Sequence, residues 1–442
     1  MIFAIGKAQS AFLLTVFISF SLSLHSHHHQ VSAESSCPYS GGNASKYHLK
    51  PLLEHSGTYH GEEGLPELLN EFSVVYTDRA LNSMSDAFVK IHKELKGVLR
   101  EAYNAENAVL LPGSGTYAME AVFRQLLSDG DTVLIVRNGY FSYRWSDIAE
   151  QVSLLGAKVV VAYAETMQLE GDKYPRVKPQ DIEKVERLIE QHRPRVVFAP
   201  HVETSTGVEL PPDYVKRIGD KVRAVSDGIF VLDGIAAGTT WIDTLSNSVD
   251  VYITAPQKGW SAPACVGVVI LNPRGEAAIR STKSDSLALN LRKWLEVSDA
   301  YDKGGFAYHT TMPTDCIALF RNAALELKKF NLGRAKTTFG KLGASVVQMV
   351  QSNGFQTVAH PKFQASGIVV IYVNKNSQPP LLFKRERTQV AAGVPWMLLE
   401  PNPSEVATVR FGLFGDDKLK NIDETTNKLA KALLAVKNEL LP

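Results

Sequence analysis

Residues 230–234 read Phe-Val-Leu-Asp-Gly, and residues 254–260 read Thr-Ala-Pro-Gln-Lys-Gly-Trp. The first stretch is an apolar run that ends in Asp233, and the second places Lys258 just after the apolar residues 251–254. Charged side chains normally seek solvent, so their position directly after apolar runs is unusual. Both residues therefore mark the ends of buried strands in an open α/β sheet, which is where such sheets bind ligands.

Short apolar runs alternate with helix-like stretches on both sides of this pair. Runs of this length indicate strands that are covered by helices on both faces, as in a mainly parallel sheet. The predicted strands are residues 108–111, 132–136, 158–162, 196–199, 230–232, 251–254 and 266–271, and the predicted helices are residues 117–127, 179–191, 213–225 and 314–329. The sequence therefore predicts an α/β fold with a mainly parallel seven-stranded sheet flanked by helices.

The C-terminal part has a different pattern, with two strands predicted at residues 367–373 and 407–411 and a closing helix at residues 418–437. This pattern indicates a smaller α+β unit. We expect a large domain at residues 56–330 and a small C-terminal domain at residues 331–442. The Ser-, Gly- and Asn-containing residues 34–55 are expected to form a flexible linker or arm.

The first 33 residues resemble a targeting segment. Lys7 precedes an apolar run at residues 11–24, and residues 31–33 supply the small side chains of a cleavage site. We expect a secretory signal peptide that is cleaved after Ala33 and sends the chain into the secretory pathway. An uncleaved membrane anchor and an organelle-targeting leader are the alternatives. On the secretory route Asn43 would lie in a glycosylation sequon.

Composition restricts the function classes. Of the 442 residues, 45% are hydrophobic and 21% are charged, as in ordinary globular proteins, and the net charge of +1 gives no reason to expect a nucleic-acid partner. The cysteines Cys37, Cys265 and Cys316 are odd in number and widely spaced, which does not form a disulfide framework. No Cys/His spacing of the zinc type is present, so no metal is expected.

Two further features suggest a ligand site. Ser114, Gly115 and Thr116 follow the strand at residues 108–111, where the backbone of a glycine turn and the start of a helix can hold an anion such as a phosphate. A plain helix cap is the alternative. Residues 201–207 read His-Val-Glu-Thr-Ser-Thr-Gly and place hydroxyls after another strand, although an ordinary polar turn explains them equally well.

The strand-end residues suggest covalent cofactor chemistry. A carboxylate at the position of Asp233 could pair with a cationic pyridinium nitrogen, or it could cap the next turn. Desolvation of Lys258 would lower the pKa of its amine and allow Schiff-base chemistry, unless the side chain lies on the surface. The two residues are 258 − 233 = 25 positions apart, which is room for one connection and one strand.

The order of these features resembles the class V aminotransferases of pyridoxal-phosphate (PLP) fold type I, and specifically their alanine–glyoxylate and serine–pyruvate branch. The resemblance extends from about residue 60 to the C-terminus. Its most specific elements are the Gln257-Lys258 pair, residues 201–207 and the run from Tyr308 to Pro313, which includes Thr311. Residues 54–60 depart from the Pro-Gly-Pro-type segment of that branch.

The resemblance implies a role for each site residue. Lys258 would bind PLP as a Schiff base and move the proton of the substrate Cα, and Asp233 would pair with the pyridine nitrogen. Phe141 would stack on the ring, Thr204 would contact the ring hydroxyl and Arg410 would bind the substrate carboxylate. The implied phosphate contacts are Ser114, Gly115, Thr116 and Gln257, with Tyr308 and Thr311 added from the neighbouring subunit of a homodimer.

The predicted function is therefore a PLP-dependent aminotransferase that moves an amino group from a small amino acid, alanine- or serine-like, to a 2-oxo acid such as glyoxylate or pyruvate. The main alternative is a class V lyase of the β-eliminating or desulfurase type. A desulfurase would need a mobile catalytic cysteine. A binding protein that keeps the fold without catalysis is a third possibility.

Overall fold

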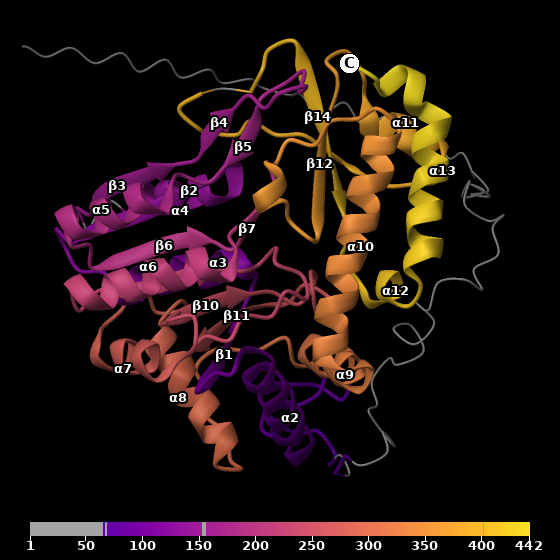
Figure 1. The fold of residues 1–442 in the computed structure, drawn as a ribbon. Helices are drawn as coiled ribbons and strands as arrows, with labels where there is room; N and C mark the ends of the chain where they lie inside the picture. Colours follow the sequence, from indigo (N-terminus) through magenta and orange to yellow (C-terminus); the bar gives the residue numbers. More distant parts are fainter. Residues whose placement is uncertain (1–64, 67–68, 153–155, 401) are drawn as a thin grey trace, which may run out of the picture. The chain divides into compact units, whose positions relative to one another are not determined.

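A seven-stranded sheet is the centre of the fold in the computed structural model, which describes residues 65–66, 69–152, 156–400 and 402–442 (Figure 1). Its strands, in spatial order, are β1 (Asn107–Pro112), β11 (Val266–Leu271), β10 (Val251–Thr254), β9 (Ile229–Asp233), β6 (Val196–Pro200), β2 (Thr132–Arg137) and β3 (Lys158–Tyr163). Only β11 runs against its neighbours; the other pairings are parallel. Each strand matches its predicted range to within one residue at either end, so the mainly parallel sheet is confirmed.

Helices cover both faces of this sheet. The central strands β6, β9, β10 and β11 are therefore buried at every residue. The helices of this part are α2 (Asp86–Tyr103), α3 (Gly115–Leu126), α4 (Tyr140–Gln151), α5 (Ile182–His192), α6 (Pro212–Val225), α7 (Pro273–Ser281), α8 (Leu291–Asp302) and α9 (Thr314–Phe330). Helix α5 packs beside α6, and α3 packs beside α4, α7 and α8. The strands therefore need no polar face, which explains their continuous apolar sequence.

A smaller antiparallel sheet follows, made of β12 (Ile368–Asn374), β14 (Val406–Gly412) and β13 (Ala391–Ala392) in that order. The accompanying helices are α10 (Leu332–Ser352), α11 (Pro379–Arg385), α12 (Asp416–Leu419) and α13 (Ile422–Leu440), with a short 3-10 turn at Pro361–Phe363. Two hairpins complete the fold: β4 (Glu165–Met167) pairs with β5 (Arg176–Lys178), and β7 (Val202–Glu203) pairs with β8 (Val208–Glu209). The small C-terminal α+β domain is thus confirmed, while the boundary at residue 330 stays a prediction.

The closing helix differs from the prediction. One helix was expected at residues 418–437, but the chain forms α12 and α13 with a break between them. Asn421 causes the break, because its extended backbone (φ −149°) leaves the helix and its side chain accepts a hydrogen bond from the Glu424 backbone N–H at 3.1 Å. Asn is a favoured N-cap residue, so the second helix begins there.

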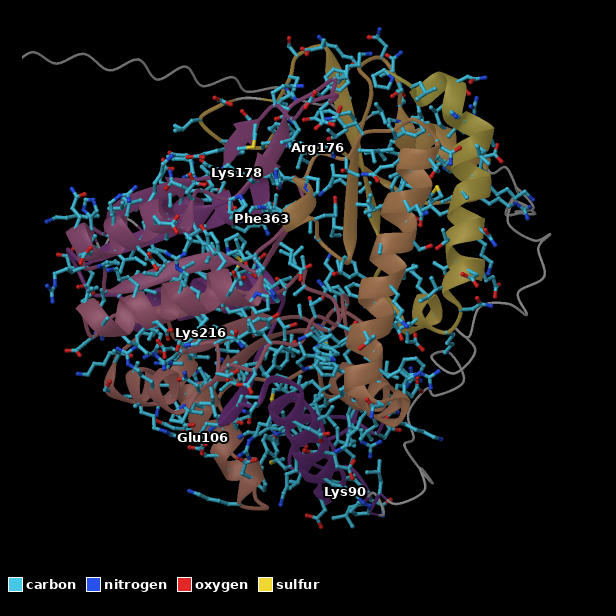
Figure 2. The ribbon with its side chains drawn as sticks, viewed as in Figure 1. Lys90, Glu106, Arg176, Lys178, Lys216 and Phe363 are labelled. Atoms are coloured by element: carbon cyan, nitrogen blue, oxygen red, sulfur yellow. The ribbon has the colours of Figure 1, made fainter. Side chains whose placement is uncertain are left out.

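The hairpin strand β5 joins the two parts. The Val177 N–H donates to the Val358 carbonyl at 2.8 Å, and the His360 N–H donates to the Val177 carbonyl at 2.8 Å. The Arg176 guanidinium donates to the Thr357 carbonyl, also at 2.8 Å. Figure 2 shows Arg176 at this junction. These bonds hold the small sheet, and therefore β14, in a fixed position beside the large one.

The sheet topology brings the predicted site together. Strands β6, β9 and β10 end in register, because Asp233 pairs with both Pro200 and Ile253. Strands β1 and β2 run in the same direction. Segments that follow the carboxyl ends of parallel strands meet at one edge of a sheet. Residues far apart in sequence can therefore share one site.

Two kinds of feature are absent from the described ranges. No helix there combines the length and the apolar character that crossing a membrane requires. No group of three or more His, Cys, Asp or Glu side chains in the same ranges could hold a metal ion. The predicted leader, the arm, Cys37, Asn43 and residues 54–60 lie outside the described residues.

The loops beyond β9 and β10 pack closely at Gly259, the residue after Lys258. A Cβ atom at Gly259 would lie 1.9 Å from the Gly238 carbonyl oxygen, whereas one at Gly340 in α10 would meet nothing within 4 Å. We expect Gly259→Ala to lower the free energy of unfolding by roughly 1–3 kcal/mol. The control Gly340→Ala should raise it by about 0.5–1 kcal/mol, because alanine favours helix. Equal urea midpoints for the two variants would contradict this packing.

Candidate active site

A cavity of about 870 Å³ lies at the carboxyl edge of the large sheet, against the small sheet. The predicted site residues that line it are Ser114, Gly115, Thr116, Phe141, Thr204, Asp233, Gln257, Lys258 and Arg410. They come from the turns after β1, β2, β6, β9 and β10 and from β14. The structure therefore gathers into one site residues that span nearly 300 positions of sequence (410 − 114 = 296).

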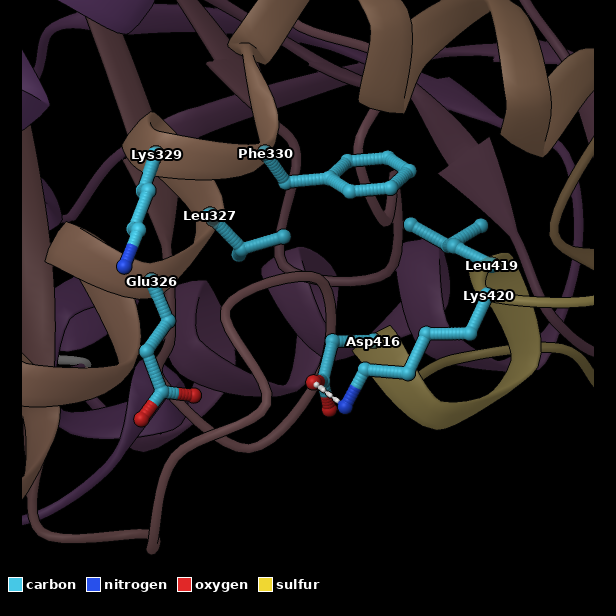
Figure 3. Close-up of a pocket in the computed structure, with 7 residues that line it drawn as sticks. All are labelled: Glu326, Leu327, Lys329, Phe330, Asp416, Leu419 and Lys420. Carbon is cyan, nitrogen blue, oxygen red and sulfur yellow. Dashed lines mark ion pairs between the residues drawn. The ribbon is translucent and has the colours of Figure 1, made fainter.

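A second cavity, of about 310 Å³, lies between the end of α9 and α12 (Figure 3). Leu327, Phe330 and Leu419 form its apolar side, and Asp416 and Lys420 form an ion pair of 3.0 Å at its rim. None of the predicted site residues lines this cavity. The chemistry predicted from the sequence therefore belongs to the larger cavity alone.

Lys258 projects from the turn after β10 into the larger cavity. Its Nζ lies 5.3 Å from the centre of the Phe414 ring, and it makes no ion pair within the described part of the chain. Burial lowers the pKa of the Lys258 amine, and the positive charge of Arg410 lowers this pKa further. A lowered pKa leaves more of the amine neutral and nucleophilic than in a free lysine.

Asp233 ends β9 and is only 9% exposed. One carboxyl oxygen accepts a hydrogen bond from the Ile235 backbone N–H at 3.1 Å, and no described cation pairs with the group. Burial therefore raises the pKa of Asp233 to about 7. A buried carboxyl group without a cation is costly, so the site is suited to a cationic ligand group.

The start of α3 has groups that are suited to an anion. Gly113 adopts a positive φ of 124°, and Ser114 is the N-cap although its hydroxyl caps no backbone N–H. The hydroxyl and the unpaired N–H groups of the first helical turn are therefore available to a ligand. Arg144 adds a positive charge, since its guanidinium donates to the Thr116 hydroxyl at 2.9 Å.

Phe141 forms a wall between two arginines. It is the second residue of α4, and its ring centre lies 5.7 Å from the Arg144 guanidinium and 5.5 Å from that of Arg410. The Arg410 Nε donates to the Ala392 carbonyl at 2.8 Å, which fixes the side chain. Arg410 makes no ion pair with any described residue, so its terminal N–H groups can bind a carboxylate.

Tyr308 and Thr311 do not reach this cavity. Their hydroxyls lie 3.4 Å apart, and Tyr308 is 61% exposed. Neither residue lines the site of its own chain. Their predicted contact with a neighbouring subunit stays a prediction, whereas the remaining predicted residues are brought together within one chain.

Three residues that shape the site were not predicted from the sequence: Arg144, Phe414 and Glu203. Arg144 and Phe414 line the cavity directly. Glu203 is fully buried and bonds to the start of α4. Arg144 lies three residues after Phe141, so the i, i+3 neighbours of a helix could have identified it. No local signal marks Phe414, because it lies after β14 and approaches Lys258 only in the folded chain.

Comparison with known proteins agrees with this geometry. An L-aspartate–glyoxylate aminotransferase from Paracoccus denitrificans is 29% identical over 220 residues, which cover 49% of this chain and 52% of that protein. A serine–glyoxylate aminotransferase from Methylorubrum extorquens is 29% identical over 266 residues, or 59% of this chain and 63% of the relative. The chain thus spans about half to three fifths of the length of these two relatives.

Solved structures share the fold. The crystal structure of alanine–glyoxylate aminotransferase from Nostoc sp. superimposes with a TM-score of 0.65 at 20% identity, covering 80% of this chain and 89% of that one. The family model described as aminotransferase class-V matches residues 66–381, which is most of the chain. From the arrangement of its site, its fold and this match, the chain belongs to the class-V aminotransferase family.

Proposed function

We propose that the chain is a PLP-dependent aminotransferase that moves an amino group from a small amino acid, alanine- or serine-like, to a 2-oxo acid such as glyoxylate or pyruvate. One observation carries the proposal: the amine of Lys258 and the buried carboxyl group of Asp233 share a cavity without an ion-pair partner among the described residues. The two relatives at 29% identity differ in the named amino donor, but the names of both include glyoxylate.

The residues present fit PLP, the cofactor of this family. A protonated pyridine nitrogen would supply the cation that Asp233 lacks. The start of α3, with Ser114 and the nearby Arg144, suits a phosphate group. The amine of Lys258 suits an aldehyde. A cavity of about 870 Å³ has room for a cofactor together with a small substrate.

When bound, PLP supplies an electron sink for the electrons of the substrate Cα–H bond. Lys258 would hold the cofactor covalently and then take the proton from the substrate Cα, a task suited to an amine of lowered pKa. Asp233 would keep a proton on the ring nitrogen. Phe141 would lie against the ring, and Thr204 would contact its hydroxyl group.

Arg410 would bind the substrate carboxylate. Its guanidinium is fixed at Nε by Ala392 and packs on Phe141, which leaves two terminal nitrogens for a bidentate contact. The cavity wall near the small sheet is formed by Ile368, Val390 and other apolar side chains. An apolar wall of this kind supports a small substrate side chain.

The lyase alternative receives little support from the cysteines. Cys265 is buried, and burial raises the pKa of its thiol to about 12, so it stays protonated. Neither Cys265 nor Cys316 lines the cavity. A desulfurase needs a mobile thiolate at the cofactor. L-Serine distinguishes the remaining cases, because amino transfer yields hydroxypyruvate without ammonia, whereas β-elimination yields pyruvate and ammonia.

We further propose a homodimer in which Tyr308 and Thr311 contact the cofactor phosphate of the neighbouring subunit. Tyr308 is 61% exposed, and the nearby apolar side chains of Leu287 and Phe306 are 80% and 50% exposed. The His309 ring bonds to the Leu287 carbonyl at 2.9 Å, which places these residues on one surface. Exposed apolar groups that gather in this way favour an interface.

Two proposals rest on the sequence alone. Residues 1–33 would act as a signal peptide that directs the chain into the secretory pathway. The chain would consist of a large domain at residues 56–330 and a small one at residues 331–442.

The role of Lys258 can be tested with Lys258→Ala. We expect this variant to lose the visible absorbance of covalently held PLP and to lower kcat by about a thousandfold or more, because both the covalent link and the proton acceptor are lost. Spectra of the purified chain and assays with L-alanine and glyoxylate measure these effects. Wild-type turnover in the variant would refute the proposed function.

The role of Arg410 can be tested with two substitutions. Arg410→Gln should raise the KM for both the amino acid and the 2-oxo acid roughly tenfold to a hundredfold, since a charge-assisted carboxylate contact is lost. Arg410→Lys keeps the charge without the planar fork and should have a smaller effect. Steady-state kinetics with alanine and glyoxylate provide the test. Unchanged KM values in both variants would show that the carboxylate binds elsewhere.

The stability of the cofactor-free chain should depend on pH through Asp233. The pKa of Asp233 is about 7 in the folded state, against 3.8 as its ordinary value, so its stability contribution is full below about pH 4 and is lost as the pH rises through 7. Asp233→Asn removes this loss. Without cofactor, the variant should therefore unfold at a higher temperature than the wild type at pH 8, where the two free energies of unfolding should differ by on the order of a few kcal/mol. At pH 4 the variant should show no such gain. A constant difference across this range would contradict the burial argument.

A further inference from the structure

Glu203 is a buried acidic residue that the proposed chemistry does not use. It ends β7, is 0% exposed and does not line the cavity. One carboxyl oxygen accepts hydrogen bonds from the Phe141 N–H at 3.2 Å, the Ser205 N–H at 3.0 Å and the Ser205 hydroxyl at 2.8 Å. The other accepts from the Ser142 N–H and the Ser142 hydroxyl, each at 2.8 Å. One carboxyl group thus joins five donors.

These bonds replace a missing helix cap. The first N–H groups of a helix need acceptors, which the N-cap side chain normally supplies. The N-cap of α4 is Gly139, which has no side chain, and a Cβ atom there would lie 2.0 Å from the Ser205 hydroxyl oxygen. Glu203 supplies the cap instead, and Ser205 extends it by accepting from the Tyr140 N–H at 2.9 Å.

The cap fixes two cavity walls at once. On one side it holds the start of α4, which carries Phe141 and, one turn later, Arg144. On the other side it holds Ser205, so that Thr204 lies between two anchored residues. The Phe141 ring in turn packs against the guanidinium groups of Arg144 and Arg410. A shift of the α4 start would therefore disturb both arginines.

We propose that Glu203 is a positioning residue for the cofactor: its carboxyl group sets Phe141 and Thr204 against the PLP ring and holds the aromatic surface on which the two cavity arginines pack. This inference rests on the proposed function, since it assumes that PLP occupies the cavity. Glu203 acts through these residues and touches neither cofactor nor substrate.

A glutamine cannot replace Glu203 without loss. Each carboxyl oxygen faces at least one backbone N–H, from Phe141 and Ser205 on one side and from Ser142 on the other. The NH₂ group of a carboxamide would oppose one of these donors in either orientation, and a backbone N–H cannot reverse its direction. Glu203→Gln therefore keeps the shape of the side chain but breaks the cap.

The chain offers a matched control in Glu209, on the adjacent strand of the same hairpin. Its carboxyl group accepts a hydrogen bond from the Ser366 N–H at 2.9 Å, and the residue is half-buried, whereas Glu203 is fully buried. It does not line the cavity or contact α4. Glu209→Gln should therefore weaken the contact of β8 with Ser366 and leave the bonds of Glu203 to α4 and Ser205 in place.

The experiment titrates the purified cofactor-free full chain with PLP and records the dissociation constant, the visible circular dichroism of the bound cofactor and the melting temperature without cofactor. We expect Glu203→Gln to raise the PLP dissociation constant about tenfold, as for one lost hydrogen bond to a charged group, and to weaken the dichroism. Glu209→Gln should leave both at wild-type values. The KM for alanine should also rise in Glu203→Gln, because Phe141 supports Arg410.

Ser205→Ala provides a second variant if Glu203→Gln does not fold. It removes one hydroxyl from the cap, so a smaller change in the same direction is expected. The inference is overturned if either folded variant binds PLP with wild-type affinity and dichroism, or if Glu209→Gln weakens binding equally. A wild-type chain that binds no PLP would instead overturn the proposed function itself.

Discussion

The alignment of parallel strand ends at one edge of the large sheet is the constraint on which the rest of the structure depends. Strands β6, β9 and β10 end level with one another through the pairs that Asp233 makes with Pro200 and Ile253. Every turn that carries site chemistry leaves from this edge. A slip of one residue would move the turn after Asp233 out of line with the turns after its neighbouring strands.

Asp233 lacks the ion pairs that a neighbouring buried carboxylate, Asp250, makes. Asp250 is 0% exposed, yet it pairs with Arg223 and Arg274 at 2.9 Å each. Asp233 is nearly as buried but forms no ion pair with a described residue, and burial raises its pKa to about 7. An unpaired buried charge costs stability, so its presence at a cavity indicates a ligand that completes the pair.

The cavity is organised from two separate parts of the chain. The large sheet supplies Lys258 and Asp233, whereas β14 of the small sheet supplies Arg410. The backbone bonds of Val177 to the segment near Val358 keep these parts together. The distance between the Lys258 amine and the Arg410 guanidinium therefore depends on a junction that contains none of the site residues.

The sequence by itself determined the fold class and the positions of the seven strands. These are local properties: an apolar run followed by Asp233 or Lys258 is visible in a few adjacent residues. Several of the nine predicted cavity residues were instead named through the resemblance to a known family, which depends on the order of motifs along the whole chain. The break before α13 was less visible, since the helical period continues across Asn421 and only the cap geometry stops it.

Only the tertiary structure decided which distant side chains meet. Glu203 reaches the start of α4 because Gly139 leaves space for it, and Phe414 approaches Lys258 from beyond β14. Such contacts depend on the packing of elements more than 60 residues apart, for example from Phe141 to Glu203 (203 − 141 = 62). Packing depends on the shapes of many side chains from distant parts of the chain, so no short stretch of sequence predicts it.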